Sequence, residues 1–592
     1  MAGVAGTIIF PPRDGEPKSA WVLRSARPTP WAWLLLPGGL FLAVLFILPL
    51  IGLLALSLGM PNWTLSNFLR IGADPAYVKV LRTTVEISVP VTALALVLAY
   101  PIAYALATRG SILRVFLLMA VVLPYFTSVL VRTFAWIILL GRGGVINDVL
   151  LKFGFVSQPI SMLYNRFTVI MGMTQIIMPL MILPIYTVMS SVDQRLLRAA
   201  RANGASALAA FLTVFLPLSL PGVLAAVLLV FISCLGFYIT PALLGGLSDV
   251  TITMEIYSQV VDQLNWSFGS ALSMVLLAAV LAILWIGSRF FPIDRLLGLS
   301  DDENASLVAV RQPLGRSWLM HIGSAANALD RWLPSIGGYG VSIASSLMGA
   351  LLLLPVLGVV YLSFSSSPYF GFPAPGYSLH NYQAYLSDMH WIRATLTSVR
   401  VALMATAIAT VLGTTLAFGL ARGRVPGRKA IVALVIAPII VPTIVVAVAT
   451  YFLLARVGLQ GTEFGLALGQ AVYSIPFVVV IVAANLRDLN PAYERAARSL
   501  GAGPVATIRT IVAPLIMPSL VVAAFFAFLN SFDDVVYVLF LGIGRISTLP
   551  MLMWQSIRQS VNPTISAVAT LQVALAAIVI AANALSRYRR RT

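Results

Sequence analysis

The sequence predicts an all-α polytopic membrane protein of about 12 transmembrane helices, arranged as two parallel six-helix repeats. Three observations predict this class: an apolar composition, recurring apolar runs of membrane-spanning length, and one polar loop that occurs twice. The 592 residues are 59% hydrophobic and 10% charged, with a mean hydropathy of +0.95. A soluble globule of this length needs far more polar surface.

Apolar segments long enough to span a bilayer recur along the chain. A hydrocarbon core of about 30 Å takes roughly 20 apolar residues as a helix, and a helix satisfies its backbone hydrogen bonds within its own segment, as lipid requires. The expected spans are residues 31–58, 80–108, 112–140, 167–191, 211–237, 266–288, 341–364, 392–420, 430–456, 465–486, 510–531 and 564–586.

The basic residues gather in alternate loops. The net charge is +18, and if the N-terminus lies inside, clusters such as those at 195–201 and 587–591 fall in the cytoplasm. The outer loop 238–265 has no Lys or Arg. This is the positive-inside pattern, so the charge indicates topology and no nucleic-acid partner, with both termini cytoplasmic.

The lone cysteine, Cys234, lies in an apolar span and is expected to be a buried, inert thiol.

The polar loop that occurs twice fixes the arrangement of the spans. Arg-Ala-Ala-Arg at 198–201 recurs at 495–498, 297 positions later, and the same offset relates Gly-Ala at 204–205 to 501–502. Each copy follows four spans and precedes two, so both loops face one compartment and the halves are parallel repeats. The expected units are an N-terminal cytoplasmic segment 1–30, a first half 31–290, a linker 291–340 and a second half 341–592. The halves have cores of about 80–288 and 392–586. The linker is either a plain cytoplasmic connection or holds an interfacial helix over 315–334.

Each repeated loop, 193–206 and 490–503, reads as a short helix that ends at a glycine, with alanines that allow another backbone to approach closely. This pattern, followed by an apolar-X-Leu-Pro stretch, resembles the signature loop of binding-protein-dependent ABC importer permeases, in both halves and over nearly the whole chain. The resemblance implies a type I ABC importer transmembrane domain in a bacterial inner membrane. It also implies that each loop is a coupling helix docked on one subunit of a cytoplasmic ABC ATPase dimer. The implied coupling residues are Arg198, Ala199, Ala200, Arg201 and Gly204, and Arg495, Ala496, Ala497, Arg498 and Gly501.

One position departs from the family pattern. Both copies carry arginine, Arg198 and Arg495, where the family usually has glutamate, and Glu494 sits one place earlier on a different helical azimuth. We hypothesise that the partner ATPase offers acidic groups there; the alternative is a solvated basic face that follows the positive-inside rule.

The chain itself shows no site for chemistry. None of its four lysines follows a glycine, as a phosphate-binding loop requires. Its three histidines show no paired metal spacing, so we expect no catalytic residue and no metal or cofactor bound by this chain. ATP and Mg are expected to be used by a separate ATPase subunit, with a periplasmic substrate-binding protein as the other partner.

The two halves further resemble the first and second permease subunits of spermidine/putrescine importers, fused. The resemblance rests on 124–128 and 143–147 in the first half and on 473–479, Asp533-Asp534, 549–550 and 562–563 in the second. It implies a polycationic solute, which carboxylates and aromatic faces suit. The candidate substrate-path residues are Asp533, Asp534, Glu86, Tyr125, Trp136, Tyr238 and Tyr537, with Phe237 at a similar depth.

Each candidate has a structural alternative. Asp533 or Asp534 caps a helix or pairs with Arg545, Glu86 pairs with Arg82 one turn earlier, and the aromatic residues anchor span ends. Arg132 and Arg400, within spans, are expected to face water or a carboxylate. The outer acids Asp249, Glu255 and Asp262 form an acidic vestibule or a docking surface for the binding protein.

Other transport functions stay open at this point. Fused permeases for ferric iron, thiamine or an organophosphonate belong to the same class. A secondary transporter would also show repeated halves, without a need for two glycine-stopped loops. A polytopic membrane enzyme lacks support from any Ser/His/Asp or histidine grouping.

Overall fold

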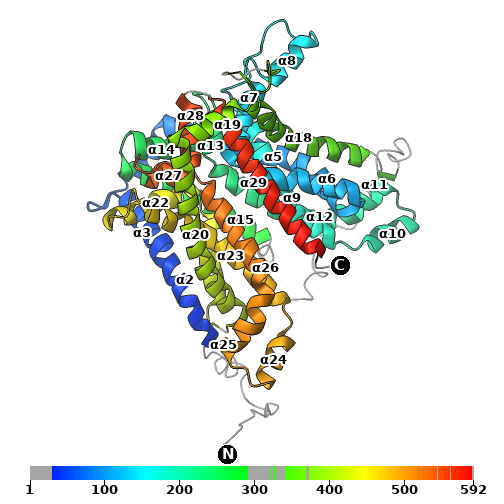
Figure 1. Cartoon of the computed structure of the whole chain (residues 1–592), viewed down its shortest axis with the longest axis vertical. Coiled ribbons are helices and arrows are strands. Elements are labelled where there is room, and N and C mark those ends of the chain that lie inside the picture. Colours follow the sequence, from blue (N-terminus) through cyan, green and yellow to red (C-terminus); the bar gives the residue numbers. More distant parts are fainter. Residues whose placement is uncertain are drawn as a thin grey trace, which may run out of the picture.

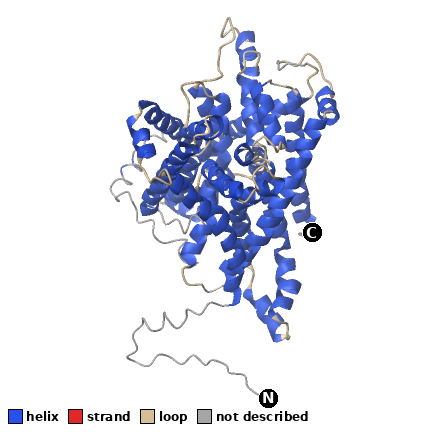
Figure 2. Cartoon of the chain, turned by 90° about the vertical axis from the view of Figure 1, so that its left-hand side faces the viewer, coloured by secondary structure: helices blue, strands red, loops and turns tan. Residues whose placement is uncertain are grey.

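The computed structural model describes residues 30–290, 321, 324, 326–327, 340–367, 372–423, 425–542, 544–559 and 562–589. The regular elements among these residues are helices joined by loops, with one isolated bridge between Ser365 and Tyr377 (Figure 2). Nearly all of the predicted segment 1–30, and most of the linker with its possible interfacial helix at 315–334, lie outside the described residues.

The first half opens with a helix that includes a 3₁₀ and a π segment. Its elements are η1 Pro30–Leu34, α2 Leu35–Leu42, η2 Ala43–Ile47, α3 Leu48–Ser57, α4 Ser66–Ala73, α5 Pro75–Thr108, α6 Ser111–Tyr125, α7 Val129–Leu140, α8 Val145–Lys152, α9 Arg166–Ser191, α10 Gln194–Ala202, α11 Ala207–Ala210, η3 Phe211–Phe215, α12 Leu216–Leu235, α13 Ile239–Leu244, α14 Ile252–Tyr257, η4 Ser258–Asp262 and α15 Trp266–Phe290.

The second half repeats this order. Its elements are α18 Val341–Ser363, α19 His380–Ser387, α20 Met389–Arg422, α21 Arg428–Ile440, α22 Thr443–Arg456, α23 Glu463–Asp488, α24 Pro491–Ser499, α25 Pro504–Thr507, η7 Ile508–Val512, α26 Ala513–Phe532, α27 Val536–Leu541, α28 Leu549–Gln559 and α29 Thr564–Arg589. Corresponding helices match in length: α5 and α20 have 34 residues, α9 and α23 have 26, and α10 and α24 have 9.

The expected spans coincide with helices, but two of them are broken. Ten described helices are long and apolar enough to cross a membrane, and α21 with α22 forms a further candidate bent by 104°. The uninterrupted span predicted at 112–140 is instead α6 and α7, with a break at residues 126–128. The span predicted at 430–456 breaks before Pro442, which cannot donate a backbone hydrogen bond. Both breaks follow a proline in the last turn, Pro124 or Pro438.

The two halves diverge like a V, with α10 at the end of one arm and α24 at the end of the other (Figure 1). The core of each arm is α5, α9 and α12, or α20, α23 and α26. The first helix of each half crosses to the opposite arm. Thus α2 packs on α20 and α3 on α22, while α18 packs on α6 and α7. The halves are therefore interlocked as well as fused.

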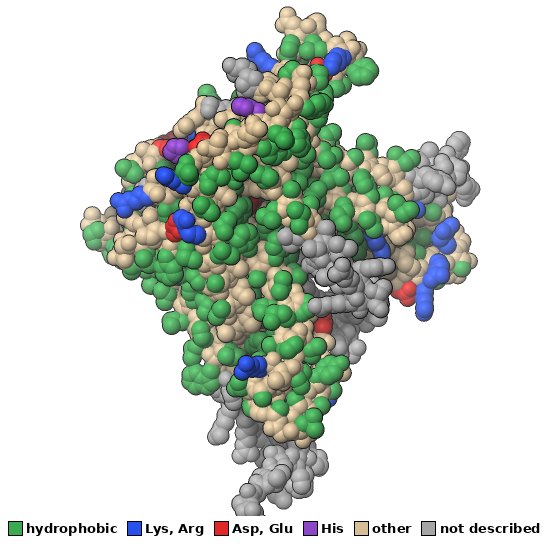
Figure 3. Space-filling view, in the orientation of Figure 1, with side chains coloured by type: hydrophobic (Ala, Val, Ile, Leu, Met, Phe, Trp, Pro, Cys, Tyr) green, Lys and Arg blue, Asp and Glu red, His purple; other side chains and the backbone are tan. Residues whose placement is uncertain are grey.

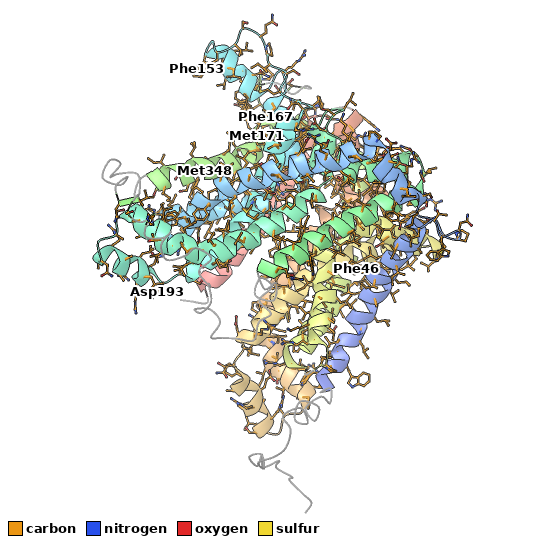
Figure 4. The ribbon with its side chains drawn as sticks, turned by 180° about the vertical axis from the view of Figure 1, so that it is seen from behind. Phe46, Phe153, Phe167, Met171, Asp193 and Met348 are labelled. Atoms are coloured by element: carbon orange, nitrogen blue, oxygen red, sulfur yellow. The ribbon has the colours of Figure 1, made fainter. Side chains whose placement is uncertain are left out.

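The outer surface fits a membrane environment. Apolar side chains cover most of the visible face, and basic side chains collect at the right-hand edge, over the end of the arm that carries α10 (Figure 3). Asp193 caps the start of α10 at the end of this arm, whereas Phe153 marks the projecting end of α8 at the top of the view (Figure 4). Cys234 is buried, as predicted.

Candidate functional site

A cavity of about 340 Å³ lies between the halves, where four helix ends meet. The break between α6 and α7 faces the turn between α26 and α27. The turn between α12 and α13 faces the break between α21 and α22, with Gly236 against Pro442. Helices α23 and α29 complete the wall. The polar and aromatic residues of the lining include Tyr125, Phe126, Ser128, Arg132, Phe237, Tyr238, Gln470, Tyr473, Phe526, Asn530, Asp533, Asp534, Tyr537 and Gln572.

Asp533 joins the two halves at this cavity. One carboxylate oxygen, Oδ2, accepts a hydrogen bond of 3.2 Å from the backbone N–H of Val129, the first residue of α7. A carboxylate stabilises a helix N-terminus by pairing with its free N–H groups and dipole. The other oxygen, Oδ1, is buried and has no hydrogen-bond partner among the described residues. The predicted capping role is thus present, and it leaves one oxygen unpaired at the cavity.

Asp534 caps the next helix in the chain. It accepts hydrogen bonds from the backbone N–H groups of Val536 (3.2 Å) and Tyr537 (3.1 Å) at the start of α27. Gln470 of α23 donates to the same carboxylate at 3.1 Å and accepts a hydrogen bond from Ser531. Neither aspartate forms an ion pair with Arg545 among the described residues.

Arg132 is the cation of the cavity wall. It is 4% exposed and donates to the carbonyl oxygen of Ile176 at 2.8 Å. Asp533 interacts with it electrostatically, without the close ion pair that the sequence led us to expect. With two carboxylates and one guanidinium, the lining has a formal charge of −1 when all three groups are ionised. Such a wall favours a cation over an anion.

Several buried polar groups at the cavity lack protein partners. Among the described residues these are Ser128 Oγ, Arg132 Nε, Asp533 Oδ1, Tyr537 Oη and both amide atoms of Gln572. Buried polar groups in proteins are nearly always hydrogen-bonded, because an unpaired one costs about 1–3 kcal/mol. Their convergence on one cavity is what a site for a polar ligand requires.

Aromatic rings line the rest of the cavity. Phe126 packs against Phe526 with ring centroids 5.3 Å apart, and Tyr238 lies between Tyr257 (5.3 Å) and Trp554 (5.5 Å). Aromatic faces attract cations, and they also pack against methylene chains. The cavity therefore combines groups for ammonium with apolar walls for the carbon chain between ammonium groups.

Two of the candidate residues lie elsewhere. Glu86 pairs with Arg82 at 2.6 Å, the alternative predicted from their spacing, and also with Arg166 of α9 at 2.6 Å. Trp136 is 4% exposed in the apolar core of the first half. Neither lines the cavity, so their role in the substrate path stays a prediction.

The outer acids do not gather into one exposed surface. Asp249 is 2% exposed and pairs with Arg166 at 3.1 Å, and Glu255 accepts a hydrogen bond from Gln259. Arg400 has the carboxylate partner expected for it, Glu463. Asp249 therefore serves an ion-pair network at the outer ends of α5 and α9.

Helices α10 and α24, the predicted docking helices, have matching ends. Asp193 and Asn490 cap their N-termini, and Gly204 and Gly501 follow their C-termini at φ of +89° and +85°, in the left-handed region that favours glycine. Arg198 with Ala199, and Arg495 with Ala496, are exposed on the two helices, whereas Ala497 and Glu494 face inward.

Several residues of the cavity, including Gln470, Asn530 and Gln572, were not among those predicted from the sequence. All three are amides within otherwise apolar spans, and an intramembrane polar residue is by itself a sign of function. Tyr473 and Phe526 carried no such sign, because aromatic residues are common throughout these spans.

Comparisons with known proteins agree with this architecture. The family model for the binding-protein-dependent transport system inner membrane component matches twice, at residues 87–290 and 409–590. The two matches together cover more than half of the chain and coincide with the two repeats.

Individual relatives are polyamine permeases. The chain is 34% identical over 230 residues to the spermidine/putrescine transport system permease protein PotB of Escherichia coli, across 38% of this chain and 83% of that protein. It is 38% identical over 112 residues to the putrescine transport system permease protein PotI of E. coli, across 19% of this chain and 40% of that protein. A chain of a bacterial alginate ABC transporter overlaps 47% of this chain and 96% of its own length, with 17% identity and a TM-score of 0.37.

Proposed function

Because the chain belongs to the family of binding-protein-dependent transport system inner membrane components, we propose that it is the transmembrane permease of a polyamine ABC importer. Both permease halves are present in one multi-pass inner-membrane polypeptide. The translocated solute is a small polycation such as spermidine or putrescine. This substrate is supported by the relatives PotB and PotI and by the chemistry of the cavity.

The observation that carries the substrate is the carboxylate of Asp533 in an aromatic-lined cavity, where, among the described residues, its oxygen Oδ1 has only the Ser128 hydroxyl beside it. An ammonium group that hydrogen-bonds this oxygen would satisfy it and balance the formal charge of the lining. The methylene segments of a polyamine would pack on Tyr125, Phe126 and Phe526.

In this proposal, ATP hydrolysis by a separate ATPase supplies the energy for transport. A cytoplasmic ATPase dimer, using ATP and Mg, docks one subunit on α10 and the other on α24, and a periplasmic binding protein delivers the solute from the opposite side. The chain performs no chemistry of its own. Nucleotide binding closes the ATPase dimer and moves both docking helices, and the arms of the V rock so that the cavity opens to each side in turn. Both termini lie in the cytoplasm.

The test is reconstitution with the ATPase and binding protein encoded beside this chain. Spermidine should stimulate ATP hydrolysis and enter proteoliposomes when its binding protein is present. Stimulation by an organic anion, by thiamine or by ferric iron, with no response to a polyamine, would overturn the substrate. Uptake driven by an ion gradient without ATP would overturn the transporter class.

A further inference from the structure

An ion pair ties the second docking helix to a core helix of its own arm. Arg422, the last residue of α20, lies 2.7 Å from Glu494 of α24, measured between Nη2 and Oε1. Both side chains are largely buried, with 19% and 14% exposed. Arg498, one turn along α24, lies 3.6 Å from the other oxygen of Glu494. Glu494 therefore faces inward, away from any partner on the exposed side of α24.

The two residues of the first arm that correspond to Arg422 and Glu494 are uncharged. Thr108 is the last residue of the matching helix α5, and its hydroxyl donates to the carbonyl of Tyr104 in its own helix. Leu197 is the residue of α10 that corresponds to Glu494, and it packs against the apolar core. In addition, Ser206 N–H donates at 2.8 Å to Asn327 of the linker. The two docking helices are thus held by different chemistry.

Helix α20 leads from this ion pair to the cavity. It packs along α23 and α26, which carry Gln470 and Asn530 of the lining, and α26 ends at Phe532, next to Asp533. A displacement of α24 that is passed to the end of α20 therefore reaches the cavity wall through packed helices. A partly buried ion pair resists separation because a lone charge left at that site is costly.

We propose that Arg422 and Glu494 are positioning residues that transmit the movement of α24 to α20, so that coupling in the second arm depends on an ion pair and coupling in the first arm does not. The proposal rests on the proposed docking of an ATPase on α24. It gives Glu494 an intramolecular role, and it leaves Arg495 as the residue that faces the partner.

The experiment compares Glu494→Gln with Arg495→Glu in the reconstituted importer. Glu494→Gln should bind the ATPase within about twofold of the original chain while the solute transported per ATP falls on the order of tenfold. Arg495→Glu should instead weaken ATPase binding. The charge-swapped double variant, Arg422→Glu with Glu494→Arg, should recover most of the coupling. Thr108→Val, at the position matched to Arg422 in the first arm, should leave coupling unchanged.

A chemical cross-link separates transmission from folding. The double variant Arg422→Cys with Glu494→Cys should be poorly coupled and should regain transport per ATP when a short bis-thiol reagent joins the two positions. The native Cys234 is buried and away from this site. Normal coupling in Glu494→Gln, no recovery in the charge swap, or loss of transport on cross-linking would each overturn the proposal. Failure of the unmodified chain to bind any ATPase would instead overturn the proposed function.

Discussion

At the scale of single residues, Asp533 is the carboxylate that joins the two halves at the cavity. It caps α7 across the interface between halves with one oxygen, and its other oxygen is buried in the cavity wall. The corresponding residue of the first half is Gly236, which packs closely on Pro442. Both carboxylates of the cavity, Asp533 and Asp534, therefore come from the second half. The two halves repeat the same backbone arrangement but differ in charge at the cavity.

Asp533→Asn tests this role with little change in shape. The amide oxygen still accepts the hydrogen bond from Val129, while the negative charge is lost. Because a hydrogen bond to a charged group contributes about 1.5–3 kcal/mol, we expect spermidine affinity to fall roughly tenfold to a hundredfold. Direct binding to the detergent-purified permease–ATPase complex measures this. Asp148→Asn, a carboxylate on α8 outside the cavity, is the control, and equal affinities for the two variants would contradict the prediction.

At the scale of helices, close crossings hold each arm together. An added Cβ at Gly413 of α20 would lie 2.7 Å from the Cβ of Val478 on α23. Small residues at such crossings let transmembrane helices approach, and this packing replaces the hydrophobic effect that lipid does not supply.

Gly413→Ala should therefore push α20 and α23 apart. We expect a loss of about 1–3 kcal/mol in stability, as for overpacked cores, seen as a lower midpoint of thermal unfolding in detergent. Gly39→Ala in α2 is the matched control, because nothing lies within 4 Å of its added Cβ. It should leave the midpoint unchanged or raise it slightly, since alanine favours the helix. A Gly413→Ala midpoint no lower than that of the control would show that the crossing has room to relax.

One ion pair joins α5 to α9 and another joins α20 to α23, and the positions of the acidic and basic residues are exchanged between the two pairs. Glu86 and Arg400 are each the twelfth residue of their helices, and Arg166 and Glu463 are each the first. The first half thus pairs Glu86 with Arg166, and the second pairs Arg400 with Glu463. Pairing α5 with α23, or α20 with α9, would bring like charges together. The reversal therefore favours assembly within each half over exchange between halves.

Arg400→Glu places two carboxylates together and should lower the midpoint of thermal unfolding slightly, because exposed charge pairs contribute little to stability. The double variant Arg400→Glu with Glu463→Arg should recover that loss, because it only inverts the pair. Thermal unfolding at low and high salt measures both, and screening should shrink the difference between the variants. A double variant no more stable than the single one would argue against pairing.

At the scale of the whole molecule, the two proposed docking helices are expected to bind the ATPase dimer together. Arg198 and Arg495 are exposed on helices at the ends of the two arms. An ATPase dimer that engages both gains affinity from the link between them. Reversing both charges should therefore weaken binding much more than reversing either one.

This expectation is tested with the variants Arg198→Glu and Arg495→Glu and with the double variant, which oppose the proposed acidic surface of the ATPase. We expect each single variant to lower ATPase affinity by roughly tenfold, the effect of about 1.4 kcal/mol, and the double variant to abolish stable assembly. Pull-down of the ATPase from detergent solution measures it. Arg393→Glu, an exposed charge near the opposite end of α20, serves as the control. Unchanged binding in the double variant would show that the arginines only follow the positive-inside pattern.

The sequence alone determined the membrane class, the positions of the apolar segments and the repeat with its two short helices that each end at a glycine. These depend on local composition, helical length and short-range signals, which any stretch of chain carries within itself. Asp533 and Asp534 were also identifiable, because carboxylates in apolar surroundings need a reason.

Only the tertiary structure decided which distant residues meet. The N–H of Val129 finds Asp533 across 404 positions, and the first helix of each half packs on the other arm. The broken spans depend on the same long-range contacts, because a gap in a transmembrane helix persists only where other parts of the protein satisfy the freed backbone groups. The cavity and the Arg422–Glu494 ion pair follow from that packing, which no local pattern specifies.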